Sequence, residues 1–153
     1  EAMAICDKVA VMNEGQIHQL DEPPQIINNP KSLFVSSFIL GNNIIKLSIK
    51  KNNLRSVIGN ISIDNLPNNE KIEFLSISPS SFELKESMSG KGKIIAREFL
   101  GEYYIYKISI LNINLRVRTS ISQNINIGKK CDVSLKSGSQ VFLFPGGHKR
   151  KIV

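Results

Sequence analysis

The sequence has little of what several classes of protein depend on. Its 153 residues contain no tryptophan, two cysteines and two histidines. Cys6 and Cys131 lie near opposite ends of the chain, and neither has a Cys or His neighbour at the spacing of a metal site. No apolar run approaches the roughly 20 residues that a membrane-spanning helix needs. These shortages exclude a disulfide-stapled scaffold and favour a soluble domain with two reduced thiols and no metal centre.

Sequence patterns of the common enzyme classes are also absent. No HExxH, GxSxG, CxxC or P-loop pattern occurs, and neither His18 nor His148 lies beside a nucleophile in sequence. The glycine- and lysine-rich stretch at 90–93 lacks the Ser/Thr and the strand–helix context of a phosphate loop, so it is better interpreted as a turn. We therefore expect no catalytic, cofactor-binding or metal-binding residue in this chain.

The charge is positive: Lys plus Arg number 20 against 13 acidic residues, for a net charge of +7. A basic balance favours anionic partners such as nucleic acid, an anionic membrane surface or an acidic protein. The lysines are spread along the chain, however, and the one dense run lies at 148–151. We interpret 148–153 as a solvated basic tail, because like charges at a terminus repel one another.

The first forty residues predict a small α+β unit. A short helix at 2–6 is followed by a buried strand at 8–12, a turn at Gly15 and a return strand at 16–20. Pro23 begins a short helix, and Ser32 is placed to cap the next one. In that second helix, Phe34 and Phe38 share a face at i, i+4.

From residue 42 the hydrophobic period changes to two, which is typical of strands. Leu115, Val117 and Thr119 alternate with polar residues, and similar alternation surrounds Ile45, Tyr106, Val133 and the pair Ile61 and Ile63. Turn signals separate the runs, among them 67–69 and 111–112. Short alternating strands at this spacing predict a mainly β fold with an OB-like barrel region at 42–147, made of two small barrels.

The N-terminal stretch resembles a known family. Positions 1–17 read EAMAICDKVAVMNEGQI, and the family pattern is EAM-x-x-(S/A/C)-D-(R/K)-(V/I)-x-V-M-x-x-G-x-I. This pattern follows the switch histidine of ATP-binding cassette (ABC) importer ATPases. The stretch at 23–39 is similar to the segment that comes next in the family, with Glu22 where a capping Thr or Ser usually stands. The resemblance implies that 1–41 is the end of an ABC ATPase domain.

The remainder resembles the regulatory TOBE domain that follows in the same ATPases. Its marker is a G-x-(V/I)…F-L-G-x-x-Y-x-Y-x-(V/I) segment, and a short L-F-P ends the family domain, present here at 143–145. The marker positions are occupied by Gly92, Ile94, Phe99, Leu100, Gly101, Tyr104, Tyr106 and Ile108. The resemblance implies that 42–147 is a TOBE/OB-like regulatory domain, and the REFLG stretch at 97–101 leans toward the ferric-iron importer branch.

The family implies a larger assembly. Its members are peripheral proteins on the cytoplasmic side of the plasma membrane that pair with a second ATPase copy and drive a permease with ATP and Mg²⁺. A chain that opens with Glu1 rather than Met is expected to be part of a longer polypeptide, with the P-loop and the other ATP-site motifs upstream. The resemblance therefore implies a regulatory and dimerisation region that couples ATP hydrolysis to solute uptake, with ferric iron as the expected solute.

Four residues are the candidate interface with a second copy: Phe99, Leu100, Gly101 and Tyr103. Barrel core is the alternative interpretation for Phe99 and Leu100. Two other functions remain open at this stage. One is a domain that senses a small anion or another regulatory ligand. The other, ranked last, is a nucleic-acid-binding OB-type barrel that stacks bases on Tyr103, Tyr104 and Tyr106.

We predict that the 153-residue chain alone neither binds nor hydrolyses ATP, because phosphoryl transfer needs groups that position Mg²⁺, nucleotide and water. A phosphate-release assay with Mg²⁺ and ATP at high protein concentration measures this. Turnover above that of a heat-denatured control would contradict the prediction.

Overall fold

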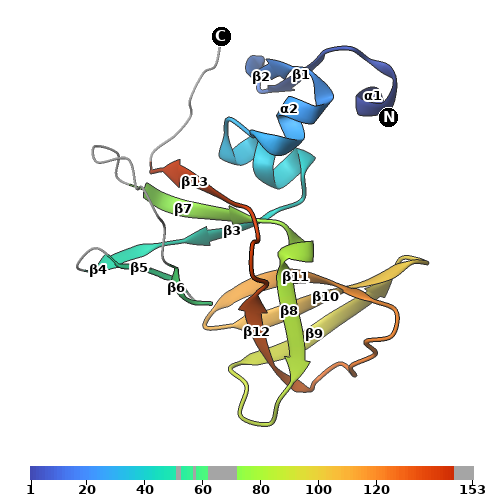
Figure 1. Ribbon diagram of the computed structural model, residues 1–153, viewed down its shortest axis with the longest axis vertical. Helices are drawn as coiled ribbons and strands as arrows, with labels where there is room; N and C mark the ends of the chain where they lie inside the picture. Colours follow the sequence, from blue (N-terminus) through green and yellow to red (C-terminus); the bar gives the residue numbers. More distant parts are fainter. Residues whose placement is uncertain (51–52, 57, 62–71, 147–153) are drawn as a thin grey trace.

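The computed structural model describes residues 1–50, 53–56, 58–61 and 72–146 (Figure 1). The strand position Ile63, the turn predicted at 67–69 and the basic tail predicted at 148–153 lie outside the described residues. None of the helices in the described part of the chain has the length and apolar character needed to span a membrane.

The chain begins with a short helix and a hairpin. α1 (Ala2–Ile5) leads into β1 (Val9–Asn13), which pairs antiparallel with β2 (Gln16–Asp21). The turn between the strands places Gly15 at a φ of 73°, a conformation that glycine adopts without a steric penalty. The predicted hairpin is confirmed, but the expectation that β1 is buried is wrong, because Val11 is its one buried residue.

Two helical segments follow the hairpin. α2 (Pro23–Asn28) begins at its predicted proline, and the Glu22 side chain makes no capping hydrogen bond. The next turn of helix runs into η1 (Val35–Ile39), a wider π-type turn. The predicted cap is confirmed, because the backbone N–H of Val35 donates to Ser32 Oγ at 3.1 Å. This part of the chain has its own small core, formed by Val11, Ile26 and Val35.

Two three-stranded antiparallel sheets come next. The first has the order β13-β7-β3 and the second β4-β5-β6. The first therefore joins the end of the described chain to its middle, and in Figure 1 it lies between the N-terminal part and the largest sheet. The strands are β3 (Asn43–Lys46), β4 (Ser48–Lys50), β5 (Asn53–Ser56), β6 (Gly59–Ile61), β7 (Ile72–Ile77) and β13 (Val141–Pro145).

The largest sheet has five antiparallel strands in the order β11-β10-β9-β12-β8. A short 3-10 helix, η2 (Pro79–Ser81), connects this sheet to β7. β12 lies between β8 and β9, so the sheet is not a simple meander. Its strands are β8 (Phe82–Glu86), β9 (Gly92–Phe99), β10 (Tyr103–Ile110), β11 (Ile113–Ser120) and β12 (Lys130–Leu135).

The five-stranded sheet curls without closing. Its two edge strands, β8 and β11, approach each other, but no hydrogen-bonded ladder joins them among the described residues. The side-chain amide of Gln123, from the loop after β11, donates to the carbonyl of Leu84 on β8 and spans part of the gap. The mainly β fold is confirmed, whereas the closed barrel is not found in the described part of the chain.

One hydrophobic core extends across both the five-stranded sheet and the β13-β7-β3 sheet. The predicted alternation on β11 is confirmed, with Leu115, Val117 and Thr119 buried and their neighbours turned outward. The two small barrels predicted from the sequence are not observed among the described residues, where two open sheets share one core. Its buried members are Ile45, Leu47, Ile72, Leu75, Ile77, Phe82, Leu84, Ile94, Tyr106, Ile108, Ile110, Leu115, Val117, Ile125 and Cys131.

Two consecutive asparagines hold the parts of the molecule together. The side-chain amide of Asn43 donates to the carbonyl of Arg116 at 2.8 Å, and its oxygen accepts from the Arg116 N–H at 2.7 Å. Asn42 donates to Ser36 Oγ at 3.2 Å and to Ser76 Oγ at 3.1 Å. The pair thereby connects η1, β7 and the outer edge of β11 through side-chain hydrogen bonds.

We predict that Asn43→Ala lowers the free energy of unfolding by about 1–3 kcal/mol, because it removes the buried side chain that pairs with both the backbone N–H and the carbonyl of Arg116. Urea unfolding followed by circular dichroism measures the change. Asn114→Ala, on the exposed side of the same strand, is the matched control and should change stability by less than about 0.5 kcal/mol. Equal losses in the two variants would contradict the role assigned to Asn43.

Candidate functional site

The four candidate interface residues lie together at the tip of the β9–β10 hairpin. This tip projects from the sheet in Figure 1. Gly101 turns the chain with a φ of 81°, and the Leu100 N–H donates to the carbonyl of Tyr103 at 2.9 Å. The side chains of Phe99 and Leu100 are 60% and 49% exposed. The alternative interpretation of these two residues as barrel core is therefore wrong.

Aromatic and guanidinium groups pack together at the base of the hairpin tip. Phe99 packs against Tyr104 with ring centroids 5.2 Å apart. Arg118 lies over the ring of Tyr103, with its guanidinium carbon 3.7 Å from the ring centroid, and Arg97 lies 5.2 Å from the centroid of Tyr104. Such cation–π contacts hold long side chains in place at a surface. The tip is thus an apolar projection on a well-supported base.

The proposed base-stacking face is not assembled as the sequence suggested. Tyr106 is fully buried, and its hydroxyl donates to the carbonyl of Gln123 at 2.7 Å while accepting from the N–H of Ile125 at 3.0 Å. Its ring belongs to the core, and Tyr104 packs half-buried against that core. Tyr106 therefore has no face available to stack on a nucleotide base.

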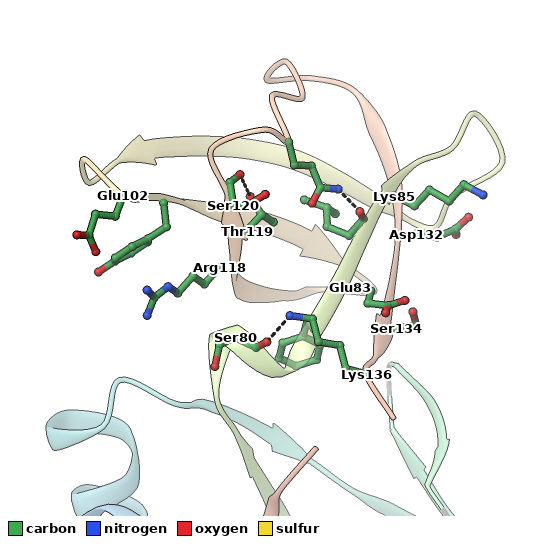
Figure 2. A pocket seen from close by; sticks show the side chains of 14 residues that line it. Ser80, Glu83, Lys85, Glu102, Arg118, Thr119, Ser120, Asp132, Ser134 and Lys136 are labelled. Carbon is green, nitrogen blue, oxygen red and sulfur yellow. Dashed lines mark hydrogen bonds between the residues drawn. The ribbon is translucent and has the colours of Figure 1, made fainter. Parts of the chain in front are cut away.

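A groove of about 770 Å³ lies where β8 and β11 fail to pair (Figure 2). Glu102 and Arg118 lie toward one end of it, and Lys85 and Asp132 toward the other. Lys136 donates to the carbonyl of Ser80 at 2.7 Å. Its charged lining residues are balanced in sign: Lys85, Arg118 and Lys136 against Glu83, Glu102 and Asp132.

The sequence did not reveal this groove. Its lining comes from segments far apart in the chain, which the curl of the sheet brings together. The one signal was the alternation of charged and apolar residues on β8, and that pattern is also typical of any half-exposed strand. No group of three metal-ligating side chains occurs in the part of the chain that the structure describes.

The N-terminal part exposes several large apolar side chains. Phe38 stacks on Phe34 with ring centroids 5.1 Å apart, yet its side chain remains 73% exposed. Single exposed apolar side chains are ordinary on a protein surface, whereas contiguous apolar patches are typical of interaction sites. The exposed residues are Ile5, Met12, Ile17, Leu20, Ile27 and Phe38.

The two cysteines differ in environment. Cys6 is exposed, whereas Cys131 is buried in the core. Burial raises the pKa of the Cys131 thiol from 9.0 to about 11, and the nearby Asp132 carboxylate adds to the increase. Gly92 lies so close that a Cβ at this position would be 3.0 Å from the Cys131 sulfur. Cys131 is therefore a packed, protonated thiol rather than a nucleophile.

No protein-family model matches the sequence. Curated proteins do, however, align with much of it. The spermidine/putrescine import ATP-binding protein PotA of Mesomycoplasma hyopneumoniae strain J is 32% identical over 126 residues, covering 78% of this chain and 28% of that protein. PotA of Mesoplasma florum is 34% identical over 110 residues, 68% of this chain and 31% of that protein.

A shorter alignment has a higher identity. PotA of Bacillus thuringiensis strain Al Hakam is 52% identical over 46 residues, covering 30% of this chain and 14% of that protein. The chain thus spans less than a third of the length of the curated relatives it matches. These relatives are named for spermidine/putrescine import, so the comparisons do not support the ferric-iron expectation. The chain is a distant homologue of the C-terminal region of the ATP-binding subunit of an ABC importer.

Proposed function

We propose that this chain is the regulatory and pairing region of the ATP-binding subunit of a polyamine importer. The observation that carries the proposal is the similarity, over 78% of the chain, to a protein named for spermidine/putrescine import. In this proposal 1–41 completes the ATPase domain and 42–147 forms the TOBE-type regulatory domain. The whole subunit binds ATP and Mg²⁺ and works at the cytoplasmic side of the plasma membrane.

The exposed apolar residues of the N-terminal part support the first half of the proposal. The α1–η1 segment has a core of three buried residues and leaves Met12, Leu20 and Phe38 largely uncovered. So small a core contributes little stability by itself. We infer that these side chains pack against the rest of the ATPase domain, through which the subunit contacts its permease.

The hairpin tip supports the second half. Phe99 and Leu100 project apolar surface from a rigid base in which Tyr103 is fixed by Arg118. Exposed apolar anchors on a rigid support are the usual centre of a protein–protein interface. We infer that this tip contacts the second copy of the subunit and keeps the two ATPases paired while their nucleotide sites open.

We predict that deleting the segment that encodes these residues from the intact gene impairs or deregulates the uptake of labelled putrescine and spermidine and leaves ferric-iron uptake unchanged. The reason is that the segment couples the ATPase to a polyamine permease. Measuring the uptake of labelled polyamines and of ferric iron in the deletion cells and in the parent cells tests the effect. A loss of iron uptake with normal polyamine uptake would overturn the assignment of the solute.

We also predict that replacing Phe99 and Leu100 together by alanine weakens self-association of the chain at least tenfold, because alanine removes the apolar anchors of the interface. Sedimentation equilibrium measures the association constant. The matched control replaces Met88 and Ile127, two exposed apolar residues near the opposite end of β9, and should leave association unchanged. Association that is equal in the two double variants would contradict the proposed interface.

A further inference from the structure

A second, smaller cavity of about 310 Å³ lies between the N-terminal part and the outer face of the five-stranded sheet. One wall is the end of η1, from Phe38 to Gly41. The opposite wall is formed by Tyr103 and Ile105 of β10 with Arg116 and Arg118 of β11. Ser78, Pro79 and Ser80 at η2 complete the lining. The cavity adjoins the larger groove, with which it shares Ser80, Tyr103 and Arg118.

The charge of this cavity is of one sign. Among the described residues, two guanidinium groups line it and no carboxylate does, whereas the larger groove balances three cations with three carboxylates. The ion pairs found among the described residues lie elsewhere, at Lys31–Asp21 and Lys129–Glu86. Two arginines on one side of a concave surface attract an anion. The carboxylate of Glu102 lines the adjoining groove together with Arg118, but it does not line this cavity.

Both arginines are held in place. The backbone of Arg116 is fixed by two hydrogen bonds with the Asn43 side chain, which donates one and accepts the other, and the guanidinium of Arg118 is stacked on Tyr103 at 3.7 Å. The two residues are separated by one position on the same strand, so their side chains leave the same face of the sheet. Positioned guanidinium groups bind carboxylate and phosphate oxygens through pairs of hydrogen bonds.

Hydroxyl groups lie beside the arginines. Ser78 Oγ and Ser80 Oγ are 2.8 Å apart, and the Ser80 N–H donates to Ser78 Oγ at 3.3 Å. Since one hydroxyl donates to the other, the accepting hydroxyl keeps its own proton available for an outside acceptor. The cavity therefore offers two charged forks and a neutral donor, which together suit an oxygen-rich anion.

We propose that this cavity binds a small oxyanion, through a phosphate or a carboxylate group, with Arg116 and Arg118 as its cationic ligands and the Ser78–Ser80 pair as hydroxyl donors. An occupant would contact both the end of η1 and the outer face of β10 and β11. It would therefore strengthen the packing of the N-terminal part on the sheet. The proposal rests on this geometry alone and is independent of the solute that the parent transporter carries.

Titration calorimetry tests the site, with inorganic phosphate and citrate as separate probes in chloride buffer at constant ionic strength. We expect saturable binding of one anion per chain, and at least tenfold weaker binding when Arg116 and Arg118 are both replaced by alanine. The control replaces Lys93 and Lys130 by alanine, which removes the same charge; these two exposed lysines pair with each other on β9 and β12, outside the cavity. It should change the affinity by less than about twofold.

A second variant distinguishes a loss of binding from a loss of folding. Replacing both arginines by lysine keeps the charge and removes the planar fork, so binding should fall to an intermediate value. NMR of the Arg side-chain N–H groups adds an independent readout, because the signals of Arg116 and Arg118 should shift with ligand. The preference between phosphate and citrate identifies the chemical group. Absence of saturable binding by both probes would overturn the proposal. So would equal weakening of binding in the arginine-to-alanine variant and in the control in which two lysines are replaced.

Discussion

The arrangement of this protein depends on how the outer edge of β11 is satisfied. An edge strand exposes unpaired backbone groups, and in a closed barrel another strand would pair with them. Here the side chain of Asn43 takes the place of a strand at one residue, with hydrogen bonds of 2.8 and 2.7 Å to the backbone carbonyl and N–H of Arg116. Because Asn43 begins β3, the same contact ties the first three-stranded sheet to the five-stranded one.

Local features of the fold followed from the sequence. The hairpin at Gly15, the proline that begins α2, the cap at Ser32 and the alternation on β11 each depend on neighbouring residues, and each was predictable for that reason. The way the strands associate depends on contacts between distant segments. Two such features have no local signature in the sequence: the insertion of β12 between β8 and β9, and the failure of β8 and β11 to pair. They explain why the five-stranded sheet curls without closing into a predicted barrel.

The candidate site shows the same division. The tip at Gly101 was recognisable from a family pattern, but the exposure of Phe99 depends on where the β9–β10 hairpin ends relative to the core. The cavity between η1 and β11 was not predictable, because its walls come from four segments that are far apart in the chain. The alternation of apolar and polar residues on β11 predicted that Arg116 and Arg118 point outward. It could not predict which other element of the chain packs beside them.

The contrast between the two thiols affects how assembly is measured. Cys131 is buried in the core beside Gly92, which keeps its sulfur away from solvent and from a second thiol. Cys6 is exposed on the N-terminal part, remote in sequence from the hairpin tip. In air, covalent dimers would therefore form through Cys6, with a geometry unrelated to that of any non-covalent pair. Molecular masses of this protein report its true association only in the presence of a reductant.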